Sequence, residues 1–146
     1  MIADFFQRLT AAHEQPLTDT DARLALAALL VRAARTDGDY APSEIARIDR
    51  ILSARYSLSP DDAADLRKDA EETEASAPDT VRFTREIKDA VPYEDRISVI
   101  EALWQVVLVD GDRAAPENAL LRLTASLLGV TDVDSAEARQ RVAKSL

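Results

Sequence analysis

Hydrophobic and polar positions along the chain follow a helical period from one end to the other. The first segment has four apolar residues at the spacing i, i+3, i+4, i+7: Ile2, Phe5, Phe6 and Leu9. No stretch shows the alternation of apolar and polar residues that is typical of a β-strand. Prolines and glycines divide the pattern into predicted helices. Five of them cover about residues 2–9, 20–36, 60–76, 93–109 and 133–145. Three more begin at Pro42, at Pro78 and at Pro116, and the last of these ends at Gly129. We therefore expect an all-α protein, a single compact bundle of seven or eight helices.

Two of the predicted helices, over residues 20–36 and 93–109, are apolar on nearly every side. Helices of this kind lie at the centre of a fold. We therefore expect them to form the core, with Trp104 of the second helix inside it. The remaining helices each carry one apolar stripe, including Ala63, Leu66 and Ala70; Phe83, Ile87 and Ala90; Leu120, Leu123 and Leu127; and Val133, Ala138 and Val142. These stripes are predicted to cover the core.

A similar eight-residue sequence motif occurs twice, and we call each copy a phrase. Residues 37–44 read DGDYAPSE and residues 110–117 read DGDRAAPE, an offset of 73 residues that is half of the 146-residue chain. Each phrase follows an apolar helix and precedes an amphipathic one. The arrangement predicts an internal repeat, about residues 20–58 and 93–130, in which two helix-DG-turn-helix hairpins are related by a pseudo-twofold axis.

The turn in each phrase has a structural explanation. Gly38 and Gly111 can adopt positive φ, which ends a helix. The residues before the prolines are alanines, which are poor N-caps. Glu44 and Glu117 fall in the first turn of the next helix, where a carboxylate meets free backbone N–H groups and the positive end of the helix dipole. In this interpretation the acids of the two phrases cap helices and stabilise the two turns between helices.

The same acids also support a second hypothesis, in which they form a metal site. Carboxylate oxygens are hard ligands that suit Ca²⁺, Mg²⁺ or Mn²⁺. An EF-hand is excluded, because its glutamate comes at position twelve of the loop, whereas here it comes at position eight. The spacing leaves open whether the two turns converge on shared ions or point to opposite ends. The candidate metal ligands are Asp37, Asp39, Glu44, Asp110, Asp112 and Glu117.

Composition and charge narrow the classes of partner. The formal net charge is −9 and the isoelectric point is about 4.6, which argues against nucleic acid and anionic membranes. The chain has no cysteine and one histidine, His13, so disulfides, thiolate metal sites and any site of two histidines are excluded. No signal peptide or membrane-spanning run is recognisable. We expect one cytoplasmic domain over residues 1–146.

The doubled phrase resembles the TerB-like tellurite-resistance family, which includes the N-terminal domain of the DjlA co-chaperone. The match consists of Asp37-Gly38 with Glu44 and of Asp110-Gly111 with Glu117, and the resemblance covers about residues 20–146. It implies an all-α pseudo-twofold bundle, an association with tellurite and chemical-stress resistance, and a metal-binding role for the shared acids. The chain departs from the family at Tyr40 and Arg113, where an aliphatic residue is common, and it has no His-Pro-Asp of a J-domain.

These observations predict a non-enzymatic TerB-like binding module that docks other proteins and holds a divalent ion at its acidic turns. The alternative is a metal-independent adaptor in which the acids cap helices. Binding would use Tyr40, which anchors a partner, or the acidic run from Asp61 to Glu74, which faces either solvent or a basic partner. A homo-oligomer is an open alternative, and a two-metal hydrolase would require the turns to converge. No catalytic residue and no organic cofactor are predicted.

Overall fold

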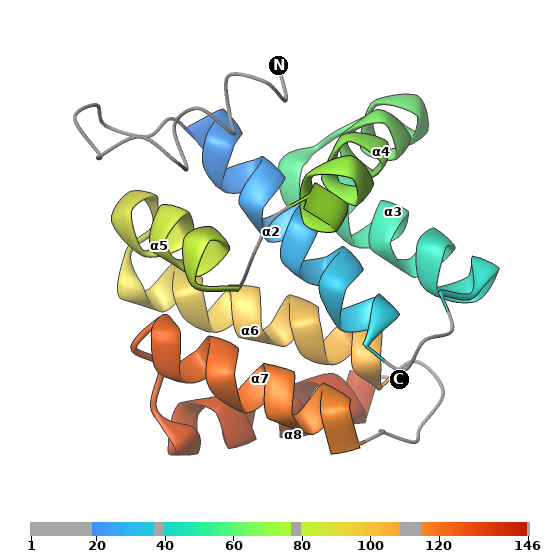
Figure 1. Ribbon diagram of the computed structural model, residues 1–146. Helices are drawn as coiled ribbons and strands as arrows, with labels where there is room; N and C mark the ends of the chain where they lie inside the picture. Colours follow the sequence, from blue (N-terminus) through green and yellow to red (C-terminus); the bar gives the residue numbers. More distant parts are fainter. Residues whose placement is uncertain (1–18, 37–39, 77–79, 109–114, 146) are drawn as a thin grey trace.

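The structure, a computed structural model, describes residues 19–36, 40–76, 80–108 and 115–145. These residues form seven helices and no strand. The helices are α2 (Asp19–Arg35), α3 (Pro42–Tyr56), α4 (Pro60–Ser76), α5 (Thr80–Ala90), α6 (Tyr93–Val107), α7 (Ala115–Leu127) and α8 (Asp132–Ser145) (Figure 1). The predicted all-α bundle is confirmed, while the predicted helix at 2–9, the two glycines of the doubled phrase and His13 lie outside the described residues.

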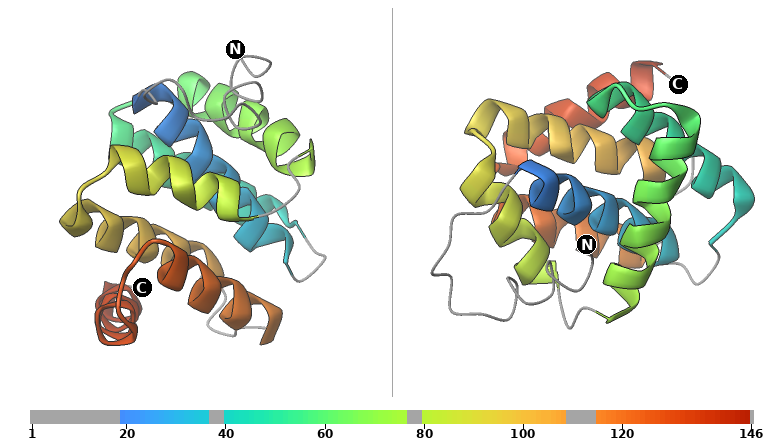
Figure 2. Two further views of the ribbon diagram at one scale, coloured as in Figure 1. Left: turned by 60° about the vertical axis from the view of Figure 1, so that its left-hand side comes forward. Right: turned by 90° about the horizontal axis from the view of Figure 1, so that it is seen from above.

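Helix α2 is the centre of the bundle, as its all-round apolar sequence predicts. Residues 25–31 of α2 are at most 1% exposed, and α2 packs against α3, α4, α5, α6 and α7. Helix α6 is the second central element, since it packs against α2, α3, α5, α7 and α8, and it lies between α2 and α8 (Figure 2, left). Trp104 of α6 is 6% exposed, which confirms its predicted place in the core.

The helix ends follow from local sequence. Ala41 is the N-cap of α3 and has extended backbone angles, and Pro42 occupies the first helical turn. Gly129 adopts φ +74° after α7, and the Val130 N–H donates to the carbonyl oxygen of Ala125 at 2.8 Å. This is the helix-ending bond of a Schellman motif, in which glycine carries the left-handed conformation without strain.

Two apolar positions were predicted to face inward and do not. Leu123 of α7 is 47% exposed and Val133 of α8 is 66% exposed. On α7 the buried stripe is Leu121, Thr124, Ala125 and Leu128, one residue round the helix from the predicted leucines. The helix presents two adjacent stripes rich in leucine, and packing against α5, α6 and α8 selects the one that includes the buried threonine. In α8, Ala138 and Val142 are buried as predicted.

Candidate functional site

Of the six predicted metal ligands, the structure describes one side chain. Asp37, Asp39, Asp110 and Asp112 lie outside the described residues, and for Glu117 only the helical backbone is described. Across the part of the chain that the structure covers, no group of three or more His, Cys, Asp or Glu residues is arranged to hold a metal ion. The remaining ligand, Glu44, is therefore the point at which the acidic turns can be examined.

Glu44 closes the start of α3. It is the third residue of that helix and is 6% exposed. Its Oε1 accepts a hydrogen bond from the backbone N–H of Ala41 at 3.1 Å. Ala41 has no polar side chain with which to cap the helix, so Glu44 supplies the reciprocal half of a capping box. The carboxylate also lies at the positive end of the helix dipole, which stabilises its negative charge.

Tyr40 lies beside this cap and is half-buried against the core. Its hydroxyl donates to Oε2 of Glu71 at 2.7 Å, and the guanidinium carbon of Arg35 lies 5.0 Å from its ring centroid. Burial and the neighbouring Glu71 carboxylate raise the pKa of the Tyr40 phenol well above its usual value of 10.0. Tyr40 therefore links the start of α3 to α4, and its use as an anchor for a partner stays a prediction.

Arg67 joins α4 to α3. Its Nε donates to Oδ1 of Asp49 at 2.7 Å, and its Nη2 donates to Oδ2 of the same carboxylate at 3.3 Å. Its Nη1 donates to Oε2 of Glu71 at 3.1 Å. The hydrogen bond to Asp49 is the largest of the effects that raise the pKa of Arg67. The two-pronged contact with Asp49 is the geometry in which arginine holds a carboxylate most firmly.

Glu74 joins α4 to α2. Its Oε1 accepts from Nη1 of Arg35 at 2.6 Å, and its Oε2 accepts from Nε of Arg32 at 3.1 Å. Arg32 also donates to the hydroxyl of Thr80 at 3.2 Å and lies 5.3 Å from the ring centroid of Phe83, so the contact extends to α5. Arg35 thus pairs with a carboxylate that is only 14% exposed.

We call these contacts the α4 charge network, formed by Asp49, Arg67, Glu71, Tyr40, Arg35, Glu74 and Arg32. It fastens the inner face of α4 to α2 and α3, beside the cap of α3. Single partly exposed ion pairs contribute little, about 0–1 kcal/mol each. A connected set in which several pairs share a carboxylate or a guanidinium holds the geometry more firmly, because each member orients the next.

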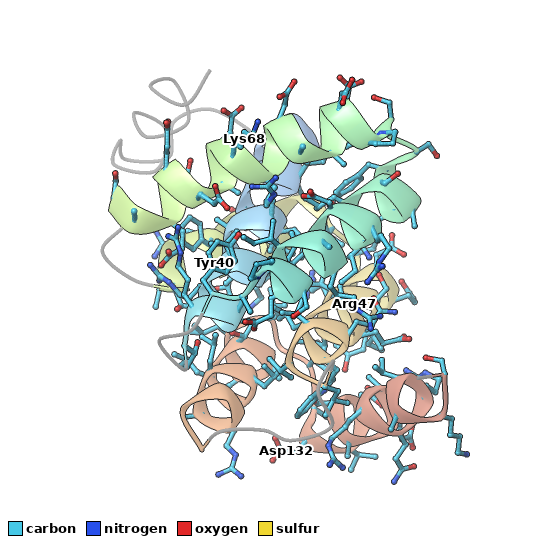
Figure 3. The ribbon with its side chains drawn as sticks, turned by 90° about the vertical axis from the view of Figure 1, so that its right-hand side faces the viewer. Tyr40, Arg47, Lys68 and Asp132 are labelled. Carbon is cyan, nitrogen blue, oxygen red and sulfur yellow. The ribbon has the colours of Figure 1, made fainter. Side chains whose placement is uncertain are left out.

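The outer face of α4 carries a different set of charges. Lys68 points away from the bundle on this face (Figure 3). We call the outward carboxylates the α4 acidic ridge, formed by the exposed residues Asp61, Asp62, Asp65, Asp69 and Glu72. The acidic run of the sequence is thus divided, with Glu71 and Glu74 bound inside and five acids facing solvent. The prediction of a solvated acidic face is confirmed for these five and wrong for the other two.

Comparison with known proteins gives one match. A protein-family model described as Tellurite resistance protein TerB matches residues 23–140. Neither the curated proteins nor the solved structures yielded a similar chain. The described helices include none with the length and apolar character needed to cross a bilayer.

Proposed function

The chain belongs to the TerB family of tellurite resistance proteins, and from that premise we propose that it is a non-enzymatic binding module that docks other proteins. The surface proposed for docking is the α4 acidic ridge, and its partner is a protein with a basic surface. The association with tellurite and chemical stress is proposed from the family alone. The match over residues 23–140 includes every element that positions the ridge.

The observation that carries this proposal is the division of charge on α4. Two carboxylates face inward and are bound by three arginines and a tyrosine, whereas five face solvent. The inward pairs fix the helix, so the outward charges are held in a constant arrangement. A fixed row of like charges steers a partner of opposite charge and sets its orientation.

The test is to reverse the ridge and compare the proteins that bind. The variant carries Asp65→Lys, Asp69→Lys and Glu72→Lys, which are exposed on one side of α4. The matched control carries Asp89→Lys, Glu94→Lys and Glu137→Lys, also exposed acids, so that the change in net charge is equal. Both variants are first checked for folding by circular dichroism.

Cross-linking in cells followed by affinity purification then reports the partners. We expect a basic protein that the wild type and the control retain and that the ridge variant loses by about tenfold or more, because like-charge contacts weaken association strongly. Equal recovery by all three proteins would contradict docking through α4.

A second candidate function is ion binding at the acidic turns. The feature that favours it is the doubled phrase, which offers six carboxylates as hard oxygen ligands for Ca²⁺, Mg²⁺ or Mn²⁺. Asp37, Asp39 and Glu44 would hold an ion at the first turn, and it would relieve their mutual repulsion. Glu44 fits a capping role directly, since Oε1 already accepts a backbone N–H. That contact supports the metal-independent adaptor, in which the acids cap helices.

Thermal unfolding distinguishes an ion-binding module from a metal-independent adaptor. The midpoint is measured with chelator and then with Mg²⁺, Ca²⁺ and Mn²⁺, for the wild type and for Asp37→Asn with Asp110→Asn. An ion at 100 times its dissociation constant adds about 2.7 kcal/mol, roughly 5–11 °C for a chain of this size. A rise of that kind that the double variant lacks supports ion binding, and no rise supports the adaptor.

We also propose the internal repeat. Adding the offset of 73 residues places α2 close to α6 and α3 close to α7, and the structure packs α2 against α6, α2 against α3 and α6 against α7. These pairings support the proposal of two similar hairpins related by a pseudo-twofold axis. In this proposal each central helix carries one acidic turn.

A further inference from the structure

A groove lies between α7 and α8, over the side of α6 that carries Trp104. Its volume is about 520 Å³, within the usual range for small-molecule sites. The apolar part of its lining consists of Trp104, Leu121, Ala125 and Ala136. Asp132, at the start of α8, marks the groove on the opposite side of the molecule from Lys68 of the acidic ridge (Figure 3). The groove is therefore a surface that the proposed protein docking does not use.

Two arginines line this groove. Arg122 comes from α7 and is exposed, and Arg139 comes from α8 and is partly exposed. The Arg139 guanidinium carbon lies 5.7 Å from the Trp104 ring centroid, so cation and ring share one wall. The Nε of Arg139 is buried and has no hydrogen-bond acceptor within the described part of the chain. A buried donor without an acceptor is costly, so a ligand oxygen that reaches it when the Arg139 side chain shifts would be stabilising.

The remaining polar lining comes from Asp132 and Ser135. No ion pair among the described residues joins Asp132 to Arg122 or Arg139. Among its described lining residues the groove therefore holds two cationic groups against one carboxylate, although the whole chain has a net charge of −9. This local reversal of sign favours an anion of low charge, because a polyanion would meet the acidic remainder of the molecule.

We propose that this groove binds a planar organic anion, an aromatic carboxylate. The aromatic body would lie against Trp104 and the apolar residues of α7 and α8. The carboxylate would accept hydrogen bonds from Arg139 and Arg122, whose forked guanidinium groups match its two oxygens. The proposal rests on the groove and its arginines, independently of the acidic ridge.

The single tryptophan of the chain gives a direct reporter for this site. The indole N–H resonance of Trp104 is followed in ¹H–¹⁵N spectra of the full chain while 2-naphthoate is added. The neutral alcohol 2-naphthylmethanol is titrated in parallel, because it has the same aromatic body without the charge. We expect 2-naphthoate to shift the resonance in a saturable way and to bind at least about tenfold more tightly than the alcohol, as charge-assisted hydrogen bonds predict.

Three variants test the assignment of the arginines. Arg139→Gln and, separately, Arg122→Gln are expected to weaken 2-naphthoate binding by about tenfold and several-fold respectively. Arg141→Gln removes an equal charge from α8 outside the groove, where Arg141 pairs with Glu101, and is expected to leave binding unchanged. The exposed Arg122 provides a readout even if Arg139→Gln disturbs folding. An unmoved Trp104 resonance, equal binding of the alcohol, or equal weakening by Arg141→Gln would overturn the proposal.

Discussion

The carboxylate of Glu44 lies against the backbone at the start of its own helix. The sequence alone did not decide whether this residue caps the helix or binds a metal ion. A carboxylate in the first turn of a helix suits both capping and metal binding, since both need the same oxygen atoms in the same place. The sequence pattern identified Glu44 as a candidate residue, but its contact with Ala41 at 3.1 Å could be seen only in the structure. The capping role can be tested without reference to any ion.

Replacing Glu44 with alanine removes the carboxylate that accepts the hydrogen bond from the Ala41 N–H. We expect Glu44→Ala to lower the free energy of unfolding by about 1 kcal/mol, the usual cost of losing a helix cap. Glu44→Gln keeps an oxygen acceptor and loses the charge, so its loss should be smaller. Chemical denaturation measures both, with Glu72→Ala on the exposed face of α4 as control. A loss for Glu44→Ala no larger than that of the control would contradict the capping role.

Tyr40 predicts a dependence of stability on pH. Its phenol has a raised pKa in the folded protein, because of burial and of Glu71, and an ordinary pKa near 10 when unfolded. The folded state thus holds this proton more tightly. The stabilisation is fully present below pH 10 and is lost as the pH rises through the folded pKa.

The variant Tyr40→Phe isolates this effect. Near neutral pH it should be less stable than the wild type by about 1 kcal/mol, through loss of the hydrogen bond to Glu71. The difference should shrink as the pH rises above about 10. Urea denaturation from about pH 8 to about pH 11 measures it. A difference that stays constant over this range would show that the Tyr40 phenol does not carry the raised pKa.

At the scale of the helices, the sequence predicted much of the fold. The positions of α2, α3, α4 and α6 follow from apolar periodicity and from the prolines that begin or separate helices. On α7 the prediction was wrong for Leu123, whereas Leu120 packs against the core, because two neighbouring stripes both carry leucines and local periodicity cannot rank them. Contacts with α5, α6 and α8 make the choice in the folded chain.

Two leucines two positions apart on α7 test that choice. Leu121 is 1% exposed and Leu123 is 47% exposed. We expect Leu121→Ala to lower the free energy of unfolding by about 2–5 kcal/mol, through lost burial and the cavity left behind. Leu123→Ala should change it by less than about 0.5 kcal/mol. Similar losses for both substitutions, measured by thermal denaturation, would mean that the leucines share the core.

The α4 charge network lies beyond what sequence reasoning reached. Arg67 and Glu71 are four residues apart on one helix, a spacing that predicts an ion pair. The other contacts join residues far apart in the chain, such as Tyr40 with Glu71 and Arg32 with Thr80, at separations of 31 and 48 residues. Nothing local distinguishes Glu71 from Glu72, although one is bound inside and the other faces solvent. Their different roles follow from the rotation of α4 on its neighbours.

At the scale of the whole molecule, this TerB-family bundle has two unlike surfaces. The acidic ridge lies on the outer helix α4, and the groove with two arginines lies between α7 and α8 (Figure 3). The central helices α2 and α6 separate the elements that carry them (Figure 1). The proposed docking through the ridge and the proposed ligand binding in the groove can therefore be tested independently, by variants in separate parts of the molecule.

We propose that the α4 acidic ridge binds a protein partner, and site-specific photocross-linking in cells can detect that contact. The photoreactive residue p-benzoylphenylalanine replaces Lys68 in the middle of the ridge, and in a separate control it replaces the exposed Gln140 of α8. We predict a discrete adduct with a basic protein from position 68, absent from position 140 and lost when Asp65, Asp69 and Glu72 are changed to lysine. No adduct from position 68, or the same adducts from both positions, would contradict the claim.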